Sequence, residues 1–69
     1  IYSQVAAWYM IEGKQKLLVL HNLGQSEMTI SLSDSLEKPL FVNGRVQSKK
    51  GKDHYQLKME GYSSAIFEL

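Results

Sequence analysis

The 69-residue sequence contains no cysteine and only one proline. Without cysteine the chain forms no disulfide bond and no thiolate metal site, which are common ways of stabilising very small domains. A chain of this length forms one domain at most, and its folding buries only about 60% of the surface that the unfolded chain exposes. We therefore expect marginal stability unless another part of a protein contributes to it.

An excess of charge of one sign is also lacking, because eight Lys and Arg residues face seven Asp and Glu residues, for a net charge of +1. Nucleic-acid-binding domains carry a strong basic excess, so no nucleic-acid partner is expected. The basic stretch Lys49-Lys50-Gly51-Lys52 is typical of a solvated turn, with a polyanion contact as the alternative. No apolar run approaches the roughly 20 residues that span a bilayer, and no membrane partner is expected.

Residue patterns that carry chemistry are absent as well. The sequence has no metal-ligand spacing, glycine-rich phosphate loop or nucleophile motif. His21 lies in an apolar stretch and is interpreted as a hydrogen-bonded or interface histidine, whereas His54 is expected on a polar, solvated strand face. We predict no catalytic residue, no metal ligand and no cofactor, so the chain alone is not expected to be an enzyme.

Two neighbouring segments, residues 5–11 and 17–23, carry apolar residues on both faces of the expected strands. A strand that is covered on one face should alternate apolar and polar residues, and these segments do not. Their second faces need a partner or leave an apolar patch in water. The chain also begins with Ile1 and has no initiator Met or signal-peptide pattern. These features predict that residues 1–69 are a single domain cut from a larger protein.

Short runs separated by turn residues indicate an all-β domain of six or seven antiparallel strands. Two small sheets packed face to face are the simplest way to bury them, and a partly open barrel is the alternative. We expect the first two strands to lie centrally in their sheet. The expected strands are 4–12, 16–23, 27–32, 39–43, 45 to about 48, 54–59 and 62–69.

The sequence predicts the conformation of three connections between strands. Gly13 tolerates a positive φ and predicts a hairpin between the first two strands. Asn43-Gly44 is typical of a type I′ hairpin, so residues 45–48 are expected to pair with residues 39–43. The loop 33–38 is expected to contain one helical turn, capped by Ser33 or Asp34.

Adjacent large side chains in the first two strands are the candidate binding residues. Trp8 and Tyr9 point to opposite faces of one strand, so one is expected in the core and the other at an interface with the missing partner. A sugar-binding aromatic platform is the alternative use of Trp8 and Tyr9. The predicted domain-interface residues are Trp8, Tyr9, Leu17, Leu18 and His21.

Residues 5–24, VAAWYMIEGKQKLLVLHNLG, resemble the start of the C-terminal β-domain of α-amylase-type glycoside hydrolases. Residues 40–44, LFVNG, resemble the middle hairpin of that family, and residues 57–69, LKMEGYSSAIFEL, resemble its closing strand. The resemblance covers essentially the whole chain. The chain departs from the family at Trp8-Tyr9-Met10, where an Arg is common, and at Gly61, where a Pro often precedes the closing aromatic residue; the subfamily therefore stays open.

The resemblance implies a small all-β Greek-key sandwich of six to eight short antiparallel strands. It also implies that a catalytic (β/α)8 barrel elsewhere in the same polypeptide holds the catalytic carboxylates. The first hypothesis is a non-catalytic domain of an α-amylase or α-glucosidase-like enzyme acting on α-glucans, which packs against the barrel and stabilises it. The second is a carbohydrate-binding module that holds starch or maltooligosaccharide. The isolated fragment is also a candidate for dimerisation through its exposed apolar face.

Overall fold

The computed structural model describes residues 4–69, and all regular secondary structure in this range is β-strand. The strand bounds lie within two residues of the expected ones at every end. The strands are β1 (Val5–Glu12), β2 (Gln15–Asn22), β3 (Met28–Leu32), β4 (Lys38–Asn43), β5 (Val46–Lys50), β6 (Tyr55–Met59) and β7 (Ser64–Glu68).

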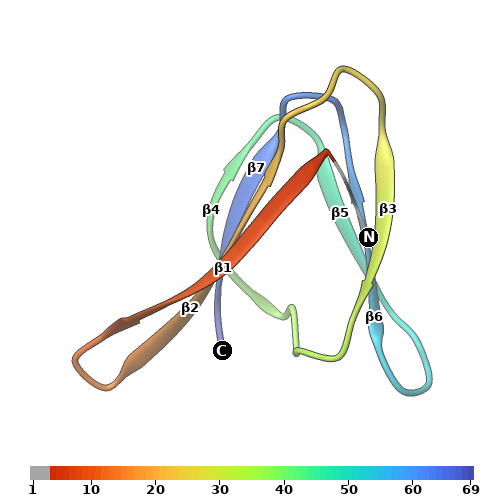
Figure 1. The fold of residues 1–69 in the computed structure, drawn as a ribbon. Helices are drawn as coiled ribbons and strands as arrows, with labels where there is room; N and C mark the ends of the chain where they lie inside the picture. Colours follow the sequence, from red (N-terminus) through yellow and green to blue (C-terminus); the bar gives the residue numbers. More distant parts are fainter. Residues whose placement is uncertain (1–3) are drawn as a thin grey trace.

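Two antiparallel sheets face each other (Figure 1). The four-stranded sheet has the order β1-β2-β7-β4, and the three-stranded sheet has the order β3-β6-β5. The β1–β2 and β5–β6 connections are hairpins, whereas the other connections cross from one sheet to the other. This arrangement confirms the predicted small antiparallel sandwich, including the hairpin at Gly13, which has φ 63°.

The core lies between the sheets and takes alternate residues from the strands that line it. The alternation predicted for β3 and β6 is confirmed, because Ile30 and Leu57 are buried while Thr29 and Lys58 are exposed. This pattern is what a sheet with one dry face and one wet face requires. The buried apolar cluster consists of Leu18, Leu20, Ile30, Leu36, Leu57, Met59, Ala65 and Phe67.

A buried asparagine joins the two sheets at one end of the core. Asn22, at the end of β2, is fully buried. Its Nδ2 lies 2.9 Å from the Ser26 carbonyl oxygen, 3.2 Å from that of Met59 and 3.1 Å from that of Glu60, and its Oδ1 accepts a bond from Gln4 Nε2 at 3.0 Å. A single side chain therefore satisfies backbone groups at the ends of both layers, as burial of polar groups demands.

The prediction that the first two strands both lie centrally is wrong for one of them. β2 lies between β1 and β7, but β1 pairs with β2 alone and forms an edge of the sheet. The reason is that side chains point above and below the sheet, whereas strands pair within its plane. An apolar pattern therefore indicates that the faces of a strand are covered and does not indicate whether both of its edges are paired. A strand can therefore be apolar on both faces and still have an open edge.

The predicted hairpin at Asn43-Gly44 is also wrong. β4 pairs with β7 and β5 pairs with β6, so this turn carries the chain between the sheets. A type I′ turn needs positive φ at both central residues, and only Gly44, at 87°, has it. The Glu60 carboxylate accepts a bond from Arg45 N at 2.9 Å, and Glu60 N donates to Arg45 O at 2.9 Å, which anchors the start of β5 to the end of β6.

The loop between β3 and β4 contains no helical turn, contrary to the expectation for Ser33 or Asp34 as a cap. Leu36 is 1% exposed and belongs to the core. Its carbonyl oxygen lies 3.4 Å from Ser48 Oγ on β5 of the three-stranded sheet. The segment is thus held by burial of Leu36 in the core instead of by local helical bonds.

The turn before β7 explains a departure from the family pattern. A Cβ at Gly61 would overlap the backbone carbonyl of Gln25, so a proline at this position would clash with the neighbouring loop. The next residue, Tyr62, takes the left-handed conformation with φ 59°, and its N–H donates to Gly24 O at 2.9 Å. Glycine at position 61 therefore allows the two loops to lie against each other.

Candidate docking surface

A row of apolar side chains crosses the outside of the four-stranded sheet. Trp8 is paired with Val19, Val19 with Ile66, and Ile66 with Phe41, one residue from each strand. Cross-strand partners share a face of the sheet. Since the neighbours of Val19 on β2, Leu18 and Leu20, point into the core, the row points away from it.

Neighbouring positions on the same strands extend this row into a surface. Trp8 is 46% exposed, Met10 42% and Phe41 52%, and no other layer within residues 4–69 covers them. Contiguous apolar surface of this kind on a soluble domain marks an interaction site. We call this surface the outer face and define it as Ala6, Trp8, Met10, Leu17, Val19, His21, Phe41 and Ile66.

Polar groups border the outer face at both ends of the β7–β4 pair. Ser64 and Asn43 are partners at one end, and Glu68 and Lys38 are partners at the other. Gln15 Nε2 donates to Glu68 Oε2 at 3.2 Å across the sheet. An apolar centre with a polar rim is the usual anatomy of a protein–protein interface.

The structure assigns opposite sides to the adjacent candidates. Trp8, Leu17 and His21 lie on the outer face, whereas Tyr9 and Leu18 lie on the side of the core. Leu18 is 3% exposed and belongs to the core cluster, so it offers no surface to a partner. The expectation that either Trp8 or Tyr9 is buried in the core is wrong, because β1 is an edge strand and Tyr9 remains 53% exposed.

Tyr9 is held by polar contacts instead of by core packing. Its hydroxyl donates to Asp34 Oδ2 at 2.7 Å, and Lys16 Nζ lies 4.6 Å from the centre of its ring. The hydrogen bond to Asp34 and the charge of that carboxylate raise the pKa of Tyr9 above its usual 10.0. Tyr9 thus connects β1 to the β3–β4 loop.

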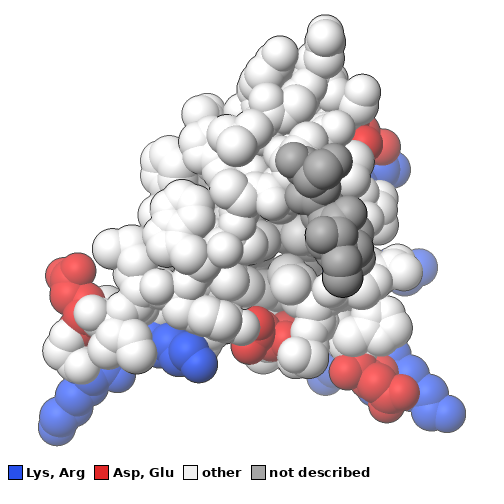
Figure 2. Space-filling view, viewed as in Figure 1, with Lys and Arg blue, Asp and Glu red and all other residues white. Residues whose placement is uncertain are grey.

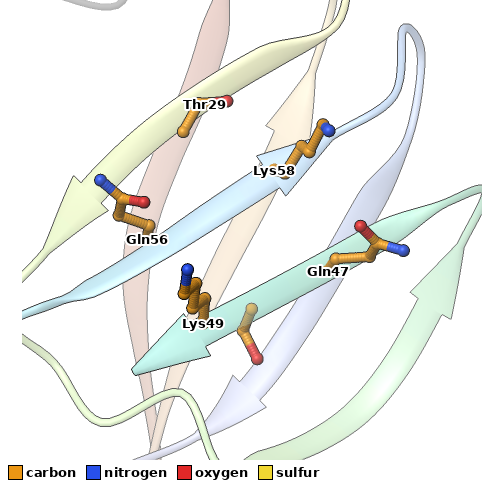
Figure 3. Close-up of a pocket in the computed structure, with 6 residues that line it drawn as sticks. Thr29, Gln47, Lys49, Gln56 and Lys58 are labelled. Carbon is orange, nitrogen blue, oxygen red and sulfur yellow. The ribbon is translucent and has the colours of Figure 1, made fainter. Parts of the chain in front are cut away.

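The outside of the three-stranded sheet is different in character. Thr29, Gln47, Lys49, Gln56 and Lys58 line an open depression of about 720 Å³ together with Ser48 (Figure 3). Lys58 Nζ lies 3.9 Å from Glu27 Oε1, and both side chains are more than half exposed. No aromatic residue lines this depression, so it lacks the flat ring that stacks on a sugar.

The part of the chain that the structure describes holds no group of three or more His, Cys, Asp or Glu residues that could bind a metal ion. His21 lies on the four-stranded sheet, and His54 is exposed in the turn before β6. Within residues 4–69 there is also no helix with the length and apolarity that crossing a bilayer requires. The outer face is therefore the strongest candidate site.

Comparison with known proteins places the chain in a family. Residues 5–66 match the family described as the α-amylase SusG C-terminal domain. The chain belongs to this family of α-amylase C-terminal domains, which confirms the resemblance. It is 48% identical to α-amylase SusG of Bacteroides thetaiotaomicron over 68 residues, which cover 99% of this chain and 10% of that protein. The chain therefore spans about a tenth of the length of this curated relative.

Sequence reasoning missed Phe41 and Ile66, which complete the row on the outer face. They lie on β4 and β7, far along the chain from Trp8, and only the pairing register brings them together. A signal was present, because residues 40–42, LFV, and 65–67, AIF, fail to alternate in the same way as the first two strands.

Proposed function

We propose that the outer face is the surface through which this C-terminal domain docks onto the catalytic part of an α-amylase-like enzyme that acts on α-glucans. In this proposal the domain carries no catalytic residue, and its role is to cover and stabilise the catalytic barrel. The observation that carries the proposal is the apolar row Trp8, Val19, Ile66 and Phe41. Its two end residues, Trp8 and Phe41, are 46% and 52% exposed, whereas Val19 between them is only 8% exposed.

Burial of this row is the physical source of the stabilisation. Apolar surface removed from water contributes roughly 25 cal/mol per Å², or about 1.5–3 kcal/mol for a large side chain that becomes fully buried. Trp8 and Phe41 are about half exposed in the free domain, so their burial would remove the most apolar surface from water. Aromatic anchors surrounded by polar groups are also typical of the energetic centre of an interface.

The test uses the full-length enzyme with the variants Trp8→Ser and Phe41→Ser. Each is expected to lower the free energy of unfolding by about 1–2 kcal/mol, because half of a large side chain leaves a buried interface. Tyr62→Ser is the matched control, because Tyr62 is 64% exposed but lies in the turn before β7 and not on the outer face. Equal effects of all three variants on unfolding would contradict the docking role.

Binding of α-glucan by Trp8 is a second candidate, favoured by its exposure on a flat sheet. The two candidates compete for the same side chain, because a docked Trp8 cannot stack on a sugar. Titration of the full-length enzyme and its Trp8→Ser variant with maltooligosaccharide separates them. Under the docking proposal, the variant keeps every saturable maltooligosaccharide-binding site of the unsubstituted enzyme. Loss of one such site in the variant would instead support glucan binding by Trp8.

A further inference from the structure

β1 differs from the other edge strands of the sandwich in having an unprotected edge. Strands at the edges of sheets offer free N–H and C=O groups, and proteins usually blunt them with proline, bulges, lysine or short length. β1 is eight residues long and has neither proline nor charge from Val5 to Ile11. Its pairing with β2 runs without a register shift to Glu12.

The other edge strands carry the usual protection. β4 begins next to Pro39 and has a register shift between Pro39 and Phe41. β5 is five residues long and ends in Lys49-Lys50, and β3 is equally short and follows Glu27. The contrast within one small domain indicates that three of these edges are built to face water and that β1 is not.

The hydrogen-bond pattern identifies the free backbone groups of β1. Leu23 N donates to Gln4 O at 2.7 Å, which places the even-numbered positions of β1 in bonds with β2, because antiparallel pairs alternate along a strand. The N–H and C=O groups of Val5, Ala7, Tyr9 and Ile11 therefore point to the open side. No other strand within residues 4–69 pairs with this side.

The side chains along this edge are exposed to solvent, as are its unpaired backbone groups. Tyr9 is 53% exposed and Ile11 73%, in addition to Trp8 and Met10 on the outer face. β1 lies at the front of the sandwich in Figure 1, and in the same view Figure 2 shows charged side chains along the border and at the projecting tips, with few in the middle. A strand with these properties is a template for β-strand addition.

We propose that an extended segment from the catalytic part of the same polypeptide pairs with β1 and adds a strand to the four-stranded sheet. The proposal rests on the docking function above. Two observations select this occupant. The SusG relative is about ten times as long as the matched region, and Trp8 and Met10 of β1 belong to the outer face, so a domain docked there lies beside the open edge.

Hydrogen exchange in the full-length enzyme tests this pairing directly. The amides of Ala7 and Tyr9 are compared with that of Lys50, which also faces an open edge, because the bond from Gly51 N to His54 O at 2.7 Å directs the odd positions of β5 toward β6. We expect Ala7 and Tyr9 to exchange about 100-fold more slowly than Lys50, since paired amides exchange only through opening. Equal exchange rates would overturn the proposal.

Proline substitution provides a second test in the full-length enzyme. Ala7→Pro removes an N–H that faces the open side and leaves the bonds of β1 to β2 in place, and Lys50→Pro makes the same change on β5. Ala7→Pro is expected to lower the midpoint of thermal unfolding, whereas Lys50→Pro leaves it nearly unchanged. Equal shifts would contradict strand addition, and exchange in the unsubstituted enzyme decides the question if Ala7→Pro prevents folding.

Failure of this inference can be distinguished from failure of the docking function. If Trp8→Ser and Phe41→Ser destabilise the full-length enzyme while Ala7 and Tyr9 exchange as fast as Lys50, docking holds and strand addition is overturned. Slow exchange of Ala7 and Tyr9 at every protein concentration supports a segment of the same polypeptide. If Ala7 and Tyr9 exchange slowly only at concentrations where sedimentation shows dimers, a second copy of the chain pairs with β1. That result would overturn the proposal that a segment of the same polypeptide does so.

Discussion

The outer surfaces of the two sheets have similar strand geometry and opposite chemistry. The three-stranded sheet presents Thr29, Lys58 and Gln47 in one cross-strand row, whereas the four-stranded sheet presents Trp8, Val19, Ile66 and Phe41. Both sheets bury their inner faces in the same core, so core formation does not explain the difference. The polar outer surface of the three-stranded sheet is therefore suited to water, and the apolar outer surface of the four-stranded sheet is suited to a protein partner.

The largest expected effect comes from placing a charge in each surface of the full-length enzyme. Trp8→Asp puts a carboxylate in the outer face at a position that is 46% exposed in the free domain, and under the docking proposal it is expected to cost about 3–5 kcal/mol in unfolding free energy, because an unpaired charge becomes buried in the interface. Gln56→Asp places the same group on the exposed polar surface and is expected to change stability by less than about 0.5 kcal/mol. Chemical denaturation measures both, and comparable losses would remove the distinction between the surfaces.

The next largest effect comes from the asparagine that joins the sheets. Asn22→Ala in the full-length enzyme removes the buried bond to the Met59 carbonyl, whereas the Ser26 carbonyl keeps Gln4 Nε2 and the Glu60 carbonyl keeps Ser63 as donor. The variant is expected to cost about 1–3 kcal/mol, since an unsatisfied buried group costs about that much. The loss does not depend on docking. Removal of Trp8 in the same protein should therefore add to it, and strong non-additivity in a double-mutant cycle would contradict separate roles.

A smaller effect is expected when apolar residues of the outer face are replaced by serine, and it differs between the isolated chain and the full-length enzyme. The double variant Trp8→Ser with Phe41→Ser is expected to raise the solubility of the isolated chain, because exposed apolar patches promote association. The same pair lowers the stability of the full-length enzyme under the docking proposal. Lys49→Ser on the polar surface serves as the control and should not raise solubility. Precipitation assays on the isolated chain measure this, and unchanged solubility of the double variant would argue against an exposed apolar patch.

The smallest expected effect concerns Tyr9, which lies on the core side of β1 and should not respond to changes on the outer face. The bond to Asp34 raises the Tyr9 pKa in the folded state, so its contribution to stability is present below about pH 10, the unfolded value, and is lost as pH rises through the raised pKa. Asp34→Ala should bring the Tyr9 titration midpoint, measured by NMR, back toward 10.0. An unchanged midpoint would contradict the bond, and Phe41→Ser serves as the variant that should leave it unchanged.

The sequence was sufficient to predict the features that depend on neighbouring residues. The alternation in β3 and β6, the Gly13 hairpin and the two-sheet class follow from local periodicity and turn residues. The missing alternation near Trp8 also predicted an uncovered apolar surface. Each of these signals is contained within one strand or one turn, and period-2 alternation needs no knowledge of the pairing partner.

The features that were not predicted depend on contacts between distant segments. Asn43-Gly44 has hairpin residues, but the β4–β7 pairing and the Glu60 contacts of Arg45 take the chain to the other sheet. The edge position of β1 and the convergence of Phe41 with Trp8 are likewise set by register across the sheet. Asn22 resembles any polar residue at the end of a strand until the carbonyls of Met59 and Glu60 are placed beside it.

Oxidative footprinting with peptide-level mass spectrometry, applied to the isolated chain and to the full-length enzyme, tests the central claim most directly. We predict that Trp8 and Met10 are modified readily in the isolated chain and are protected several-fold in the full-length enzyme, while acetylation of Lys49 and Lys58 is the same in both. Equal modification of Trp8 and Met10 in the two proteins, or protection of the lysines instead, would contradict the assignment of the outer face as the docking surface.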